Sequence, residues 1–308
     1  MRYAFFQGCN IPVRIEQYAI ATQAVFQKFD LELVEVRDFN CCGYPVRNVD
    51  EKSYILPSVR NLAIAEKMNL DIVVICNCCF ASLMKAKSVL DKNGSLQNEI
   101  NHILAKEGLQ YTGKALVRHY LSVLYNDVGI EKITKKLVYK VKNLGIAVIQ
   151  GCHILRPREI LHFDNSFVPK ITDALVQCTG AENLDWRGKL ECCGAALAGI
   201  NDPLCHDLLT EKILGARQAG AQFITPICSY CYLQFDTTQQ IISPHQEDIL
   251  PVLLYPQLLG MCLGISEKEL GLEKNRTIGP QDIEKITSSL GSPEEDRKKR
   301  KKKIKQPA

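Results

Sequence analysis

Ten of the fourteen cysteines form two sets that share one order and nearly one spacing. In each set a single cysteine follows a short apolar segment, an adjacent Cys-Cys pair precedes a glycine, and a Cys-x-x-Cys motif follows another apolar segment. The first set is Cys9, Cys41, Cys42, Cys76 and Cys79, and the second is Cys152, Cys192, Cys193, Cys228 and Cys231. A repeat of this length indicates two copies of one structural unit, so two similar halves are predicted.

The segments between the cysteines predict an α/β fold with a short parallel sheet in each half. Apolar stretches typical of strands alternate with helical stretches at residues 14–29 and 62–68, and again at residues 167–178 and 204–219. Residues 183–190 form the weakest of the predicted strands. This alternation is typical of Rossmann-like parallel sheets. All ten cysteines then follow the carboxyl ends of strands, where open α/β sheets bind their ligands.

Four regions are predicted along the chain. They are a first half at residues 1–100, a helical connector at 101–143, a second, pseudo-symmetric half at 144–265 and a C-terminal segment at 266–308. The connector is expected to be helical because it carries an apolar stripe, made of Leu116, Val117, Tyr120, Leu121 and Leu124. His119 lies on this stretch and is expected to be a packed or surface histidine rather than a metal ligand.

The net charge of +4 depends on the C-terminal tail. Residues 291–308 carry a charge of +5, which leaves −1 for the rest of the chain. From about residue 290 the tail is expected to be disordered and solvated. No folded basic face is expected behind it, so nucleic-acid binding is not predicted.

The N-terminus and the apolar stretches bear on where the chain acts. The residues MRYAFFQGCN lack the apolar core of an export signal, so a cytoplasmic location with reduced thiols is expected. The longest apolar stretch, residues 251–265, is shorter than the roughly 20 residues of a membrane span and contains Pro256. It is expected to be a helix that is buried or faces a partner protein.

Clustered reduced thiols indicate metal or redox chemistry. Zinc is one candidate because Cys-x-x-Cys is a common half-site, but structural zinc takes four ligands and each half offers five cysteines. Adjacent cysteines also suit one small tetrahedral ion poorly, because neighbouring side chains at a strand end point apart. Soft thiolates without histidines favour an iron–sulfur cluster. The usual ferredoxin run of four cysteines is absent from the sequence, so electrons must come from another protein.

The paired sets, with CCG in each and QGCHILRP opening the second, resemble the B subunit of heterodisulfide reductase, a family of the CCG-domain type. The resemblance covers nearly the whole chain, including the connector and the stretch PVLLYPQLLGMCLG. It implies two noncubane 4Fe-4S clusters, each held by the five cysteines of one set. It also implies reduction of the mixed disulfide of coenzyme M and coenzyme B, placed between the clusters so that each sulfur meets one iron.

The substrate of that family is anionic, so cations are expected at the entrance to the site. Coenzyme M carries a sulfonate and coenzyme B a phosphate. Arg14, Arg156 and Arg158 follow the first cysteine of each half and are the candidates to bind them. His153, next to Cys152, is the candidate proton donor, with a structural hydrogen bond as the alternative.

Four cysteines fall outside the two sets. Cys78 has no counterpart in the second set and is expected to be either a spare thiol or a thiol that lies next to the metal ligands without being one. Cys76 with Cys78 would also place two thiols near a metal. The other three are expected to be buried as small apolar residues; they are Cys178, Cys205 and Cys262.

The resemblance also implies partners. A separate, ferredoxin-like C subunit of heterodisulfide reductase and, through it, the flavin-containing A subunit would supply electrons, with an exposed apolar helix within residues 251–265 as part of the docking surface. Two alternatives stay open. Related CCG-type proteins carry electrons in complexes that oxidise 2-hydroxyacids or glycerol-3-phosphate, and the substrate can be a different disulfide. The two complete repeats favour disulfide reduction over an electron relay.

Overall fold

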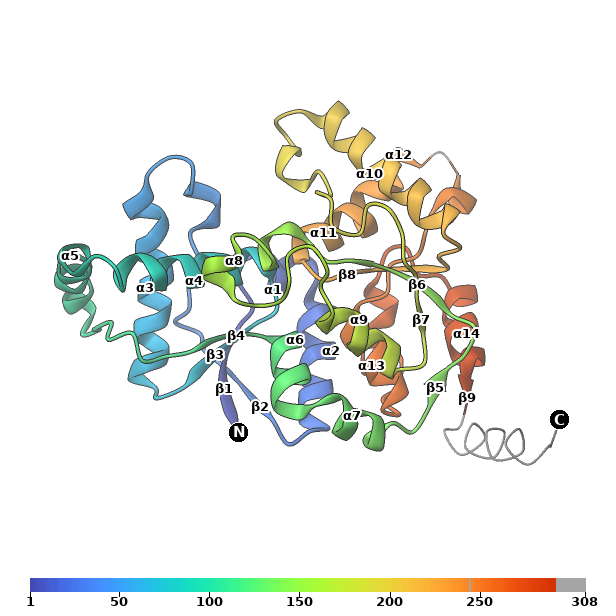
Figure 1. Cartoon of the computed structure of the whole chain (residues 1–308), viewed down its shortest axis with the longest axis horizontal. Helices are drawn as coiled ribbons and strands as arrows, with labels where there is room; N and C mark the ends of the chain where they lie inside the picture. Colours follow the sequence, from blue (N-terminus) through green and yellow to red (C-terminus); the bar gives the residue numbers. More distant parts are fainter. Residues whose placement is uncertain (244, 292–308) are drawn as a thin grey trace.

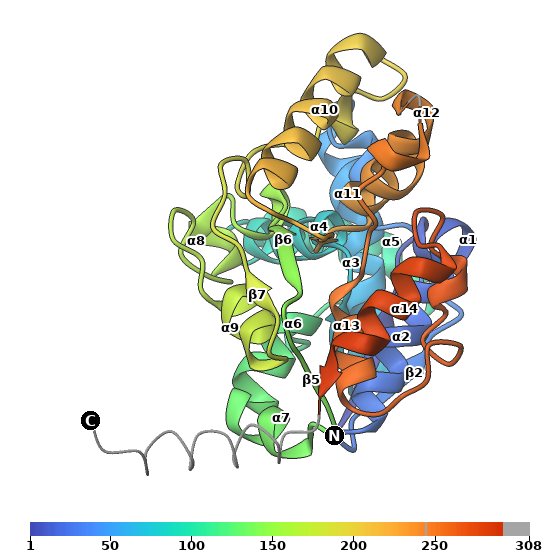
Figure 2. The same ribbon diagram turned by 90° about the vertical axis from the view of Figure 1, so that its right-hand side faces the viewer.

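The computed structural model describes residues 1–243 and 245–291 (Figures 1 and 2). Each half contains a short parallel sheet surrounded by helices, which confirms the predicted α/β class with two similar halves. Of the tail predicted to be disordered from about residue 290, residues 292–308 lie outside the described residues.

The first sheet has four strands in the order β2-β1-β3-β4. Strand β1 (Arg2–Phe6) pairs in parallel with β2 (Glu32–Glu35) on one side and β3 (Asp71–Val74) on the other. The buried residues of β1 and β3 form near-continuous apolar runs, as a parallel sheet covered on both faces requires. The helices of this half are α1 (Ile11–Arg14), α2 (Glu16–Gln27), α3 (Glu51–Lys67) and α4 (Asn77–Leu90).

Helix α3 begins well before the predicted helical stretch. The carboxylate of Asp50 accepts a hydrogen bond from the backbone N–H of Ser53 at 2.6 Å, which caps the helix at its N-terminus. Pro57 therefore lies inside the helix rather than before it.

The second sheet has three parallel strands in the order β7-β6-β8. Strand β6 (Gly145–Ile149) is buried at every position and pairs with β7 (Glu182–Asn183) and β8 (Phe223–Pro226). The weakest predicted strand accordingly forms only two paired residues. The helices of this half are α8 (Arg158–Leu161), α9 (Ile171–Cys178), α10 (Asp202–Gln218), α11 (Ser229–Leu233) and α12 (Gln239–Ile242).

The connector is helical only in part. Helices α6 (Tyr120–Ser122) and α7 (Ile130–Lys136) lie within the predicted connector, and only the last turn of α5 (Gly94–Leu104) extends into it. The expected helical stripe is wrong at its start, because Val117–His119 forms strand β4 and Leu116 is exposed. Pairing with β4 satisfies backbone groups that β3 would otherwise leave open at the sheet edge.

The apolar stretch near the C-terminus forms helix α13 (Tyr255–Cys262), which is buried at all eight positions. Figures 1 and 2 both show α13 beside α2 of the first half. The expected burial is confirmed, but the expected docking of an exposed helix to a partner protein is wrong, because packing within the chain already covers this helix. After it come α14 (Pro280–Ser289) and an antiparallel pair, β5 (Lys140–Val141) with β9 (Leu290–Gly291).

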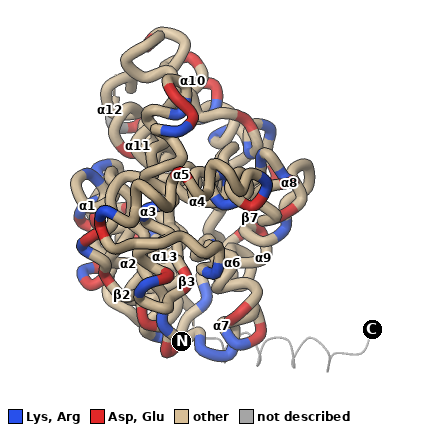
Figure 3. Tube along the Cα trace, turned by 90° about the vertical axis from the view of Figure 1, so that its left-hand side faces the viewer, with Lys and Arg blue, Asp and Glu red and all other residues tan. Residues whose placement is uncertain are grey.

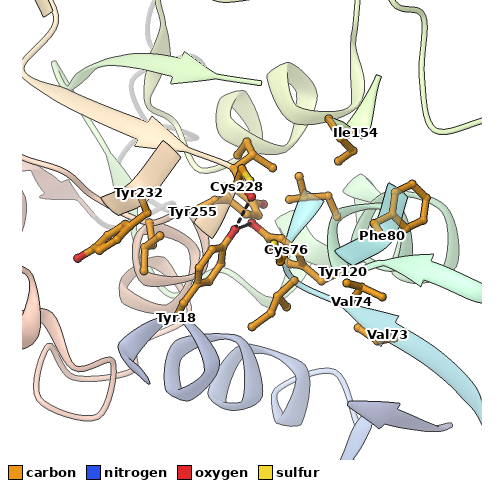
Figure 4. Packing of buried hydrophobic residues seen from close by; sticks show 14 of the residues in the cluster. Tyr18, Val73, Val74, Cys76, Phe80, Tyr120, Ile154, Cys228, Tyr232 and Tyr255 are labelled. Atoms are coloured by element: carbon orange, nitrogen blue, oxygen red, sulfur yellow. Dashed lines mark hydrogen bonds between the residues drawn. The ribbon is translucent and has the colours of Figure 1, made fainter. Parts of the chain in front are cut away.

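Buried tyrosines join the two halves. In Figure 4 the Tyr18 ring points from α2 toward Cys76 and Cys228. Its hydroxyl donates a hydrogen bond to the carbonyl oxygen of Ile227 at 2.8 Å and lies 3.2 Å from the hydroxyl of Tyr120. Because buried hydroxyls need partners, these contacts hold α2 of the first half against the strand end of the second.

The surface of the described chain carries mixed charge. Figure 3 shows lysine and arginine interspersed with aspartate and glutamate. Exposed ion pairs such as Arg2 with Glu32 contribute little to stability. Within residues 1–243 and 245–291, no helix has both the length and the apolar character needed to cross a membrane.

Candidate metal centre

Both cysteine sets lie beyond the carboxyl ends of strands. Cys9 follows β1, the pair Cys41 and Cys42 follows β2, and Cys76 stands between β3 and α4. The second set repeats this arrangement after β6, β7 and β8, with Cys152, the pair Cys192 and Cys193, and Cys228. Parallel strands end at one edge of their sheet, so each set is gathered at that edge.

The thiols of the first set form one continuous group. The Sγ atoms of Cys9 and Cys41 are 3.9 Å apart. Side-chain hydrogen bonds link Cys41 to Cys42, Cys42 to Cys79, and Cys79 to Cys76. All five predicted cysteines are therefore together in the folded chain.

The second set repeats the same order of contacts. Side-chain hydrogen bonds link Cys152 to Cys192 and Cys192 to Cys193. The Sγ atoms of Cys193 and Cys231 are 3.2 Å apart, and a side-chain hydrogen bond also links Cys231 to Cys228. The repeat in the sequence is therefore also a repeat in how the thiols are arranged in the folded chain.

The two sets meet at a junction formed by Cys76, Cys78 and Cys228, whose Sγ atoms all lie within 4.8 Å of one another. The Sγ atoms of Cys78 and Cys228 are 4.0 Å apart. The hydroxyl of Ser229, in the second half, donates to the Sγ of Cys76 at 2.9 Å. All of these side chains are buried, so the junction is fixed by packing as well as by hydrogen bonds.

The residue after the first cysteine of each Cys-x-x-Cys motif reaches into the other half. Ser229 does so toward Cys76, and Asn77 donates from its amide to the carbonyl oxygen of Gln150 at 3.0 Å, next to Gly151. A Cβ atom on Gly151 would lie 2.6 Å from that amide nitrogen. These reciprocal contacts fix how the two sets face each other.

Gly43 and Gly194 allow each Cys-Cys pair to turn toward the following helix. Both have positive φ values, 84° and 80°. A Cβ atom at Gly43 would lie 2.3 Å from the carbonyl oxygen of Tyr54, and one at Gly194 would lie 2.9 Å from that of Cys205. Glycine is required here because the turn is left-handed and lies against helix backbone.

The crowding of thiols sets their protonation. Hydrogen bonds with Cys42 and Cys9 lower the pKa of Cys41 to about 2, while bonding to Cys41 raises the pKa of Cys42 to about 12 and also raises that of Cys9. In the second set the pKa is about 2 for Cys192 and about 12 for Cys193. One thiolate therefore suppresses ionisation of its neighbours. A cation that compensates the repulsion is needed before all can ionise.

The donor set is suited to iron–sulfur binding. Each set offers five thiols, one more than a structural zinc ion takes. In the described part of the chain, the cluster of potential metal-binding side chains at the junction contains only cysteines. Several soft thiolates around a site of this kind fit an iron–sulfur group.

Among the described residues, none of the three predicted arginines forms a hydrogen bond or ion pair with a thiol of either set. Arg14, Arg156 and Arg158 are all exposed. A different cation, Arg47, follows the first Cys-Cys pair and reaches across to the second half, where its Nη1 lies 2.9 Å from Nε2 of His153.

Arg47 belongs to a small cluster beside the junction. Its guanidinium stacks on the ring of Tyr44 at 4.1 Å, and the Tyr44 hydroxyl lies 3.2 Å from Nε2 of His153. The other nitrogen of His153, Nδ1, is 3.2 Å from the Sγ of Cys152. Burial, and then the charge of Arg47, lowers the pKa of His153 below its ordinary value. In the sequence, the one indication that Arg47 lies near the site is its position five residues after the Cys41–Cys42 pair.

The repeated arrangement agrees with comparisons to known proteins. Residues 3–84 and 146–236, which include all ten cysteines, match the model of the cysteine-rich domain CCG. A relative from Methanosarcina acetivorans, the B subunit of its "Ferredoxin/F(420)H(2)-dependent CoB-CoM heterodisulfide reductase", is 32% identical over 92% of this chain and 97% of its own length. This chain belongs to the family of heterodisulfide reductase B subunits, which are CCG-domain proteins.

Other relatives carry related names. The B subunit of the "Ferredoxin:CoB-CoM heterodisulfide reductase" of Methanosarcina mazei is 30% identical over 92% of this chain and 97% of that protein. The "8-methylmenaquinol:fumarate reductase membrane anchor subunit" of Wolinella succinogenes is 32% identical over 89% of this chain and 96% of that protein. Membership of this family supports a part in electron transfer or disulfide reduction within a complex of several subunits.

The fold also resembles a solved structure. A hypothetical protein from Helicobacter pylori superposes with a TM-score of 0.67 at 16% identity, covering 90% of this chain and 52% of that one. At this identity the likeness supports the fold alone.

The burial expected for three of the four cysteines outside both sets is confirmed. Cys178, Cys205 and Cys262 are buried. Cys205 accepts a hydrogen bond from the amide of Gln234 at 2.9 Å, behind the second Cys-Cys pair. Cys78, in contrast, stands at the junction and contacts the second set.

His119 is a packed histidine, as expected. It is fully buried against the rings of Phe80, Tyr120 and Phe163. Its Nδ1 accepts a hydrogen bond from the backbone N–H of Leu121 at 3.4 Å, while Nε2 has no partner among the described residues. Burial lowers the pKa of His119 to about 3.

We predict that His119 makes the folded chain less stable as the pH falls. The unfolded imidazole has an ordinary pKa of about 6.5, so between about pH 6.5 and 3 the unfolded chain binds a proton that the folded chain does not. The contribution to stability is complete above pH 6.5 and is lost at up to roughly 1.4 kcal/mol per pH unit as the pH falls through this range. Urea unfolding at several pH values should show a shallower pH dependence for His119→Phe, and an unchanged one for the exposed control His102→Gln. Equal slopes for His119→Phe and wild type would contradict the prediction.

Proposed function

We propose that this chain reduces a disulfide at two noncubane 4Fe-4S clusters, one held by each set of five cysteines. The observation that carries the proposal is the junction, where thiols of both sets lie within 4.8 Å. Disulfide reduction takes two electrons and iron–sulfur clusters transfer one at a time, so two facing centres suit the reaction. When bound, the clusters would supply the electrons and hold one sulfur each.

The first cluster would be held by Cys9, Cys41, Cys42, Cys76 and Cys79, and the second by Cys152, Cys192, Cys193, Cys228 and Cys231. The equal order of contacts in the two sets supports this assignment. Cys78 is the one junction thiol without an equivalent in the other set, so we propose it as a neighbour of the clusters rather than a ligand.

The substrate proposed is the coenzyme M–coenzyme B heterodisulfide, in line with the names of the relatives from Methanosarcina. Its sulfonate and phosphate need cations. Arg47 is better placed than Arg14, Arg156 or Arg158, because it is held beside the junction by Tyr44 and His153. Within residues 1–243 and 245–291 no carboxylate forms an ion pair with Arg47 in this structure, which leaves its charge available to an anion.

His153 is proposed to pass protons to the released thiols. Its Nδ1 faces Cys152 at 3.2 Å, and its Nε2 faces Tyr44 and Arg47. Because its pKa is lowered, the imidazole is neutral near pH 7 and has one N–H to donate. As Nδ1 gives up its proton, Nε2 takes one from the Tyr44 hydroxyl at 3.2 Å, and that hydroxyl takes one from solvent, so each proton delivered to a thiol comes finally from water.

The partners proposed are the ferredoxin-like C subunit of heterodisulfide reductase, which would pass electrons to this chain, and the flavin-containing A subunit behind it. The names of the relatives, which are those of subunits, support an assembly of this kind. With α13 buried, docking would use other surfaces than that helix.

A second candidate function is electron transfer without disulfide reduction. The Wolinella succinogenes relative favours it, because that protein is named as a subunit of a fumarate reductase and is as similar to this chain as the relative from Methanosarcina acetivorans, at 32% identity. The two functions differ in whether a thiol or disulfide binds at the junction.

We predict that Cys78→Ser retains the full iron content, whereas Cys79→Ser loses about half of it. Cys79 belongs to the repeated contact order and Cys78 does not. Iron analysis and absorption spectra of the anaerobically purified variants measure the cluster content. Because Cys78 and Cys79 are adjacent in the first turn of α4, each variant controls for a general loss of folding in the other. Loss of a cluster in Cys78→Ser would contradict the proposed ligand set.

We also predict that Arg47→Met raises the KM for the heterodisulfide on the order of tenfold or more, because a charge-assisted contact to an anion is lost. The turnover number should change much less. A dye-coupled assay with a low-potential one-electron donor, counting two thiols per disulfide, measures both constants. Arg14→Met is the control and should match wild type, since Arg14 is exposed and outside the Arg47 cluster. An equal KM in Arg47→Met and Arg14→Met would contradict the placement of the substrate anion.

A further inference from the structure

Helices α3 and α10 occupy equivalent places behind the two Cys-Cys pairs. The glycine of the first pair lies against the carbonyl oxygen of Tyr54, and the glycine of the second lies against that of Cys205. These two contact points are 151 positions apart in the chain. The same offset relates Asn61 on α3 to Lys212 on α10.

In the first half the equivalent position is neutral. Asn61 is fully buried, and its side-chain amide forms two hydrogen bonds with the backbone of Asn40. The amide oxygen accepts from the N–H of Asn40 at 2.9 Å, and the amide nitrogen donates to the carbonyl oxygen of Asn40 at 3.1 Å. Its amide is also 3.5 Å from the carbonyl oxygen of Cys41. This side chain fixes the loop before the pair and adds no charge.

In the second half the equivalent position is a buried cation. Lys212 is only 3% exposed, and its ammonium group donates to the carbonyl oxygen of Gly188 and lies 5.6 Å from the centre of the Trp186 ring. No carboxylate of the described residues lies within ion-pair distance of it. Burial lowers the pKa of Lys212, and the groups that oppose this by favouring its charge are Glu191 and the cysteines of the second set, Cys231, Cys193 and Cys192.

A buried lysine is costly without a negative partner, and beside Glu191 the groups that favour the charge of Lys212 all belong to the second cysteine set. Adding an electron to an iron–sulfur centre increases its negative charge, so a buried cation nearby stabilises the reduced form. The neutral Asn61 gives the first centre no such stabilisation.

We propose that Lys212 raises the reduction potential of the iron–sulfur centre held by the second set, so that this centre is reduced before the one held by the first. The proposal rests on the proposed function, since it requires both centres. One electron from the partner protein, or from a chemical reductant in the experiment, adds one negative charge beside Lys212. The two centres are then unequal although their ligands are equivalent.

The experiment is a potentiometric titration of the full chain, purified anaerobically with its iron, followed by EPR. In Lys212→Met the midpoint potential of one centre should fall by an amount equal to at least a tenfold change in its reduction equilibrium, which is about 59 mV for one electron. The centre that shifts should be the one with the higher potential in wild type. Lys212→Arg keeps the charge and should restore the wild-type value.

Arg217→Gln is the matched control. It removes a cation from the same helix, where the half-buried Arg217 donates a hydrogen bond to the carbonyl oxygen of Glu247 at the surface, so no potential should shift. If Lys212→Met shifts no more than Arg217→Gln, or if only the lower-potential centre shifts, the proposal is overturned. Lys212→Gln is titrated with the same criteria if Lys212→Met loses iron.

The order of reduction is also tested without changing Lys212. In Cys231→Ser, which removes a proposed ligand of the second set, the higher-potential signal should be the one lost, and loss of the lower-potential signal would overturn the order. These results differ from a failure of the proposed function itself. That failure would show as wild-type protein with no pair of reducible iron centres.

Discussion

Repulsion between closely spaced thiolates is the constraint on which this structure depends. Each half places five thiols in contact. Hydrogen bonds from neighbouring thiols lower the pKa of Cys41 and of Cys192, and the same bonds raise the pKa of those neighbours, which are Cys9 and Cys42 in the first set and Cys152 and Cys193 in the second. Such a group is unfavourable as free thiolates and favourable around a soft, positively charged metal group. The fold can impose it because parallel strands end at one edge, and because glycine after each pair allows the turn against α3 or α10.

The placement of the two sets relative to each other depends on contacts between the halves. Ser229 donates to Cys76, Asn77 donates to the carbonyl oxygen of Gln150, and Tyr18 donates to that of Ile227. Each of these bonds joins a buried residue of one half to a strand end or cysteine of the other. Helix α13 adds apolar packing from the end of the described chain against α2 of the first half. Two similar halves therefore form one site rather than two separate ones.

The sequence predicts the features that local patterns determine. The cysteine spacing and the apolar stretches before the cysteines are enough to predict two parallel sheets with ten thiols at the strand ends. Features that depend on distant parts of the chain were missed. Strand β4 was expected to be helical because its apolar spacing also fits a helix, and only the open edge of β3 decides between the two. The choice between burial and docking for α13, and the contact between Arg47 and His153, each depend on packing between segments far apart in sequence.

The central claim is that a disulfide is reduced between two iron–sulfur centres at the junction of the cysteine sets. It is tested most directly by titrating the anaerobically purified, oxidised protein with coenzyme M and then with other thiols, following EPR and counting iron and zinc on the same sample. The account predicts about eight iron atoms per chain, from two clusters of four iron each, and a new paramagnetic signal that appears with one particular thiol. Iron present with no thiol changing the spectrum, or zinc in place of iron in an oxygen-free preparation, would contradict it.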